Sequence, residues 1–169
     1  MKKVFVILII VIPIVFVGSF LYSRFNPPLA VSGGYAYQED KEVMIVDVGN
    51  KYPFGSIKIT ELLVNNQNQP SKAKMQVSTH SLGFIISDQF NSEEAAEYQF
   101  ESIENVKLKP NTDPRGQLDK VNEGTISNED LIYAVTLGHE RSIEKVIIKY
   151  SYLGVPYEKI VSTTVGEIE

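Results

Sequence analysis

The chain has 169 residues, no cysteine and a formal net charge of −5 at pH 7. Without cysteine it can form neither disulfides nor thiolate metal sites, and it has no thiol nucleophile. Two of its 16 basic residues, Lys2 and Lys3, precede a long apolar run, so 14 basic residues remain against 21 acidic ones, a net charge of −7. Such a surface is unsuited to nucleic acid, whose binding depends on neutralising phosphates.

Residues 4–22 form an almost unbroken apolar run directly behind Lys2 and Lys3. At about 1.5 Å per residue, a helix over this run is roughly 28 Å long, close to the hydrocarbon thickness of a bilayer. The run exceeds the apolar core of a secretory signal, about 7–15 residues, which favours a retained anchor over a cleaved signal. Residues 1–23 are therefore predicted to be a cytoplasmic start and a transmembrane anchor, with the lipid bilayer as partner of residues 4–22.

The charges that flank the run predict its orientation. Lys2 and Lys3 lie on its N-terminal side, whereas Arg24 is the only cation near its other end. The positive-inside rule places the N-terminus in the cytoplasm and the rest outside a cell membrane. Residues 24–34, which contain two prolines and two glycines, predict a tether. Residues 35–169 suffice for one extracytoplasmic domain with a core of its own.

Alternation of apolar and polar residues dominates the remaining sequence and predicts β-strands. The predicted strands cover residues 43–48, 57–64, 72–78, 84–86, 106–109, 131–137, 145–152 and 157–164. Many short strands in a chain of this size favour a mainly β fold, an immunoglobulin-like β-sandwich, with a small barrel as the alternative. Aromatic residues in the strands, such as Tyr150, Tyr152 and Tyr157, are interpreted as packing residues rather than a recognition patch.

One short helix is predicted over residues 92–98. Asn91 can cap it, and Glu94 follows three residues later, as in a capping box. Phe90 is placed to pack against Ala95 as a hydrophobic staple. The helix is expected to close one end of the sandwich.

The longest predicted loop, residues 110–130, is the candidate binding loop, because loops on rigid scaffolds often carry binding. It starts like a calcium loop but has Arg115 at a ligand position and lacks the glutamate at position twelve, so no metal site is predicted. The residues expected to contact a partner are Asn111, Asp113, Arg115, Asp119 and Glu123.

The two histidines, His80 and His139, are far apart in the sequence and are interpreted as exposed turn residues rather than metal ligands. No nucleophile–base pattern is legible in the chain. No catalytic residue, metal or cofactor is therefore predicted.

The start Met1-Lys2-Lys3, the single apolar anchor, the absence of cysteine and a β-rich tail containing the sequence IIKYSYLG at residues 147–154 resemble small uncharacterised membrane-anchored proteins of Bacillus-type bacteria. The resemblance implies an anchored envelope protein and assigns no functional residue. We expect an extracytoplasmic interaction or accessory module, without catalytic activity of its own, whose partner is an envelope protein. The alternatives are a small envelope hydrolase with a site assembled only in space, and a secreted binding protein if the N-terminal segment is cleaved.

Overall fold

The structure is a computed structural model that describes residues 24–37, 42–127 and 129–162, together with residues 11, 18 and 22. Most of the predicted anchor, residues 4–22, lies outside the described residues. Within the part that is described, no helix has both the length and the apolar character needed to cross a membrane. The anchor therefore remains a prediction from the sequence.

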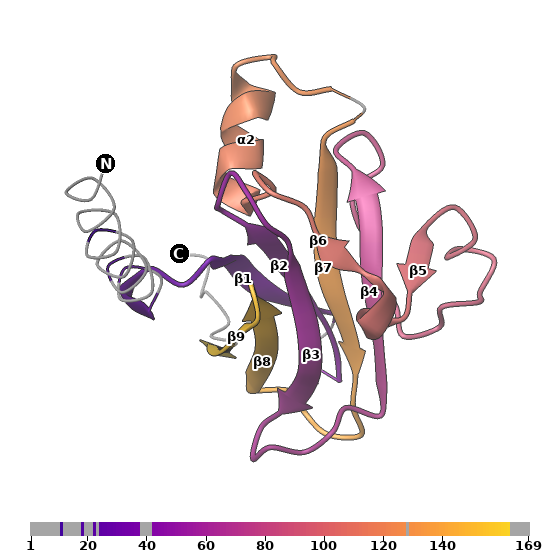
Figure 1. Cartoon of the computed structure of the whole chain (residues 1–169). Helices are drawn as coiled ribbons and strands as arrows, with labels where there is room; N and C mark the ends of the chain where they lie inside the picture. The colour runs from indigo at the N-terminus through magenta and orange to yellow at the C-terminus, as the bar shows by residue number, and fades with distance from the viewer. Residues whose placement is uncertain are drawn as a thin grey trace, which may run out of the picture.

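The described chain forms two antiparallel sheets, and the α-helix α2 and a short 3-10 helix lie between strands of these sheets in the sequence (Figure 1). One sheet has the strand order β1-β2-β7-β4-β5, and the other has the order β6-β3-β8-β9. The strands are β1 (Leu29–Tyr37), β2 (Val43–Asn50), β3 (Ile57–Val64), β4 (Lys72–Thr79), β5 (Gln99–Glu101), β6 (Lys107–Leu108), β7 (Leu131–Gly138), β8 (Lys145–Tyr152) and β9 (Val155–Ser162). The helices are η1 (Ile103–Asn105) and α2 (Pro114–Asn122), and α2 lies at one end of the sheets near β1 and β2.

The two sheets share one hydrophobic core. Alternate residues of β2, such as Met44 and Val46, belong to this core together with alternate residues of β8, such as Val146 and Ile148. The alternation follows from the pleat of a strand, which directs successive side chains to opposite faces. The mainly β fold predicted from the sequence is confirmed, and the arrangement is consistent with a β-sandwich.

The prediction of a tether over residues 24–34 is wrong from Leu29 onward, because β1 begins there and pairs with β2. The glycine pair that contributed to the tether prediction lies inside this strand. The pairing register shifts between Ser32 and Gly34, and Gly33 has a φ of 66°. Glycine adopts this left-handed conformation without steric cost, so the pair forms a β-bulge.

The predicted helix over residues 92–98 is also wrong, since this stretch forms turns. The backbone N–H of Ala95 does receive a side-chain cap, but it donates to Ser92 Oγ at 3.3 Å rather than to Asn91. The helix of the structure, α2, lies instead within the predicted loop at residues 110–130. There the Asp113 side chain caps the helix by accepting the N–H of Gly116 at 3.2 Å, and Pro114 occupies the first turn.

Asp47 lies on β2 between the core residues Val46 and Val48, so it faces away from the shared core. Burial raises the pKa of its carboxyl to about 6 from an ordinary value of 3.8. A raised pKa in the folded state means that Asp47 destabilises the fold once it ionises, as the pH rises from about 4 through 6.

We expect Asp47→Asn to raise the free energy of unfolding by about 1–2 kcal/mol at pH 8, after allowance for partial exposure of the carboxyl. The gain should disappear below about pH 4, where aspartate is protonated in both states. Denaturant unfolding of the full-length protein in detergent at pH 8, 6 and 4 measures this. Glu104→Gln, at an exposed carboxylate, is the control and should change little. A gain that is equal at all three pH values would contradict the assignment to ionisation.

Candidate functional site

The connection between β4 and β5, residues 80–98, covers the outer face of the five-stranded sheet (Figure 1). On β4, Met75 belongs to the shared core, and the next residue, Gln76, therefore points to the opposite face. Gln76 is nevertheless fully buried, as is Thr136 on the neighbouring strand β7. The connection buries these polar residues and so creates a second packed layer outside the sheet.

The Gln76 side chain links the connection to the sheet through hydrogen bonds. Its Oε1 accepts the backbone N–H of Ile85 at 3.1 Å, and its Nε2 donates to the carbonyl oxygen of Ile85 at 2.6 Å. The same Nε2 donates to Thr136 Oγ1 at 2.6 Å. The amide thus takes the place of a neighbouring strand for residue 85. The strand predicted at residues 84–86 is not formed, because a side chain rather than a backbone ladder satisfies these groups.

Two further contacts hold the connection in place. Lys72 Nζ lies 2.8 Å from Asp88 Oδ2 in a salt bridge, and a Cβ placed on Gly138 would lie only 3.1 Å from the Cβ of Asp88. The ring of Phe90 packs on the ring of Phe100, which lies in β5, with centroids 5.0 Å apart. The connection therefore has a fixed path although it contains no helix or strand.

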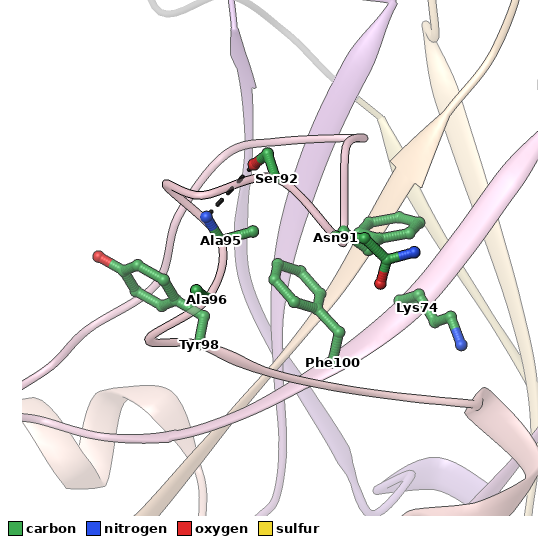
Figure 2. A pocket seen from close by; sticks show the side chains of 8 residues that line it. Lys74, Asn91, Ser92, Ala95, Ala96, Tyr98 and Phe100 are labelled. Atoms are coloured by element: carbon green, nitrogen blue, oxygen red, sulfur yellow. Dashed lines mark hydrogen bonds between the residues drawn. The ribbon is translucent and has the colours of Figure 1, made fainter.

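Two adjoining depressions open on this connection, and we call them together the crossover surface. The first has a volume of about 350 Å³ and is shown in Figure 2; it is lined by Lys74, Phe90, Asn91, Ser92, Ala95, Ala96, Tyr98 and Phe100. The second has a volume of about 500 Å³ and is lined by Val43, Phe84, Ile85, Ile86, Ser87, Asp88, Gln89, Ser92 and Glu94. Ser92 lines both, so one extended ligand could contact the two depressions.

The lining of the first depression combines aromatic rings with a few polar groups. Figure 2 shows the ring of Phe100 between Tyr98 on one side and Lys74 on the other. Lys74 Nζ donates to Ser102 Oγ at 3.5 Å. Aromatic anchors with a small number of polar groups are typical of surfaces that bind polypeptide segments. The lining contains no histidine and no acidic residue.

The five residues predicted as a binding loop take two different roles. Asn111 and Asp113 hold the start of α2, because the Asn111 carbonyl accepts the Gln117 amide at 2.8 Å and Asp113 caps the helix. Arg115, Asp119 and Glu123 follow at intervals of four residues along α2 and are exposed, so they share one helical face. Part of the segment predicted as a loop, Pro114–Asn122, is therefore a helix that carries Arg115 and Asp119 on one side, with Glu123 at its C-cap.

His80 and His139 are half-buried rather than exposed, so that prediction is corrected. One ring nitrogen of each, Nε2 of His80 and Nδ1 of His139, is buried without a hydrogen-bond partner. The antiparallel register pairs Lys72 with Gly138 and Thr79 with Leu131, so the histidines lie at opposite ends of β4 and β7 and share no pocket. Within the described ranges, no three side chains of the ligand types converge as a metal site would require.

The strand tyrosines are packing residues, as predicted. Tyr150, Tyr152 and Tyr157 are all buried, and the rings of Tyr150 and Tyr157 stack at 5.3 Å. Burial raises the pKa of Tyr150 to about 12.

The sequence prediction missed the crossover surface. The sequence feature that could have indicated this surface is Gln76, a polar residue on β4. The neighbouring strand β7 carries Thr136, which also faces outward. No protein-family model, curated protein or solved structure matches this chain.

Proposed function

We propose that the chain is a membrane-anchored, extracytoplasmic interaction module without catalytic activity of its own. The apolar run at residues 4–22 would cross the bilayer with the N-terminus in the cytoplasm, and the β domain would stand outside. The partner would be an envelope protein, which the anchor brings to a high effective concentration.

We also propose that the two sheets form an immunoglobulin-like sandwich. The constant-type immunoglobulin fold arranges its strands as A-B-E-D in one sheet and C-F-G in the other. Without the short strands β5 and β6, the sheets here have the orders β1-β2-β7-β4 and β3-β8-β9, which correspond to that arrangement. Folds of this class commonly serve as binding modules, although a fold alone does not establish a function.

The observation that carries the binding proposal is the crossover surface. Its connection is ordered by the Gln76 amide and the Lys72–Asp88 salt bridge, so it can present aromatic rings without a large cost in conformational entropy. The two adjoining depressions suit an extended peptide segment that places successive side chains into each of them.

Photo-crosslinking in cells tests the proposal. With p-benzoylphenylalanine in place of Tyr98, we expect one recurrent envelope protein to be captured. Most of this adduct should be lost when Phe100→Ala removes a ring from the same depression. The matched positions are Thr60, exposed on β3, and Asp119, exposed on α2.

Capture of a partner at each of the three positions leads to a different conclusion. Capture of the protein at residue 98 but not at residue 60 would support the crossover surface. Capture at residue 119 alone would move the binding surface to the charged side of α2. The absence of a recurrent adduct at either 98 or 119 would overturn the binding proposal.

A further inference from the structure

A cluster of aromatic rings lies at the end of the domain where the chain enters it. The ring of Tyr52 lies 6.5 Å from that of Tyr22 and 5.5 Å from that of Tyr152, and Phe54 lies 6.4 Å from Tyr152. The Tyr52 hydroxyl donates to the carbonyl oxygen of Asn26 at 2.6 Å, and the Tyr152 hydroxyl donates to that of Phe54 at 2.7 Å. We call this region the aromatic end; it comprises Tyr22, Phe25, Tyr52, Phe54, Tyr152 and Leu153.

Three apolar side chains of the aromatic end are exposed far beyond what packing of the domain requires. Phe25 is 81% exposed, Phe54 is 59% exposed and Leu153 is 65% exposed. Leu153 also has a φ of 49°, a left-handed conformation that leucine rarely adopts and that asparagine or glycine usually occupies in such a hairpin turn. Leu153 neither favours the turn conformation nor packs in the core. Its positive φ and its exposure together therefore indicate a contact outside the chain.

The charge of the aromatic end is opposite to that of the domain. The segments that form it, residues 22–28, 50–60 and 150–157, contain Arg24, Lys51 and Lys58 and no acidic residue. Lys107, on β6, pairs with Lys58 on β3 and adds a fourth cation beside them. Residues 109–113 also border this end, because the Asn111 N–H donates to the Tyr52 carbonyl, and they add a fifth cation, Lys109, and one carboxylate, Asp113. The remainder of an otherwise acidic domain thus carries the negative charge, and this end suits an anionic surface.

We propose that the aromatic end is inserted into the headgroup region of the same bilayer that residues 4–22 cross. This inference rests on the proposed anchor. Tyr22, the last residue of the apolar run, lies against Tyr52, so the domain begins at the membrane surface without a spacer. Aromatic rings and basic side chains are the residue types that gather at membrane interfaces, and anionic lipids attract the latter.

Insertion would also orient the domain. Ile57, the first residue of β3, pairs with Tyr152, the last residue of β8, at the aromatic end, so β3 leads away from this end and the antiparallel β8 leads toward it. The sheets would then stand steeply on the membrane. The crossover surface, which lies along the face of β4, would point sideways toward neighbouring membrane proteins.

Because the chain contains no tryptophan, a single introduced one reports on its own surroundings. We would reconstitute the full-length Phe54→Trp protein in vesicles of phosphatidylcholine and phosphatidylglycerol that carry a nitroxide quencher close to the headgroup. The control is Asn66→Trp, exposed in the turn after β3. That turn lies at the other end of an eight-residue strand, whose last residue is about 23 Å from Ile57.

We expect the Phe54→Trp protein to show a blue-shifted emission and several-fold stronger quenching than the Asn66→Trp protein. Equal quenching in the two variants, in protein that floats with the vesicles, would overturn the insertion and leave the anchor intact. A blue shift in the Phe54→Trp protein without lipid quenching would also overturn it, because another protein surface, such as a second copy, would then cover this end. Protein that fails to float with the vesicles would overturn the anchor and the insertion together.

Discussion

The Gly49→Ala variant is expected to lose about 3 kcal/mol or more of its free energy of unfolding. A Cβ at Gly49 would lie 1.8 Å from the carbonyl oxygen of Thr112 and 2.6 Å from its carbonyl carbon. These are backbone atoms, and they are held in place: the Asn50 N–H donates to Thr112 Oγ1 at 3.0 Å, and the Thr112 N–H donates to the Asn50 carbonyl at 2.9 Å. Either β2 or the segment before α2 must therefore move. Denaturant unfolding of the full-length protein measures the loss.

Gly116→Ala is the matched control, because the same methyl group enters a position with room for it. The nearest atom to a Cβ at Gly116 is a carboxylate oxygen of Asp113 at 3.6 Å, an ordinary van der Waals contact. Gly116 lies in α2, where alanine is the better helix former, so the substitution should raise the stability by about 0.5–1 kcal/mol. A similar change at both glycines would contradict the steric argument.

Gln76→Met is expected to release the connection over residues 80–98 and to lower the free energy of unfolding by about 2–4 kcal/mol. Methionine fills nearly the same volume but cannot pair with the buried backbone N–H and carbonyl of Ile85. Thr136 also loses its partner. Hydrogen exchange should therefore accelerate most at the amides around Ile85, and crosslinking from residue 98 should fall with it.

Gln99→Met is the control for this prediction. Gln99 is exposed on β5, and its side-chain amide donates to the side chain of Glu101, on the same strand, at 3.1 Å. The substitution should leave both the stability and the exchange around Ile85 almost unchanged. Unaltered exchange in the Gln76→Met protein would show that the connection is held by other contacts.

The strands could be predicted wherever one face of the sheet is apolar and the other polar. In β8, Val146, Ile148 and Tyr150 alternate with Lys145, Lys149 and Ser151, and the predicted and observed bounds coincide. β1 escaped prediction because its glycine pair resembles a flexible segment, and only pairing with β2 shows that it forms a bulge. α2 escaped because Asp113, Pro114 and Gly116 are turn formers as well as helix-start residues.

The crossover surface could not have been located from local sequence patterns. Gln76, Ile85 and Thr136 come from three separate parts of the chain, and only the folded sheet brings them together. In the sequence alone, each of these three residues is an ordinary strand or loop residue. The aromatic end is similar, since Tyr22, Tyr52 and Tyr152 become neighbours only where the β2–β3 connection and the β8–β9 hairpin meet the incoming chain.

The edges of the two sheets affect whether copies of the domain that are crowded on one membrane can pair with one another through their strands. β5 has three residues and β6 has two, so neither offers much backbone for another strand to pair with. β6 covers only Ile57 and Lys58, so the rest of β3 also lies at an edge, and its pairing with β8 is interrupted by a register shift between Ile59 and Glu61. The edge strand β1 is interrupted by the bulge at Gly33. β9 is a long and regular edge, and it carries the charged residues Glu158 and Lys159, which discourage strand addition. The domain is thus protected against sheet-to-sheet polymerisation, a hazard that crowding in two dimensions would otherwise increase.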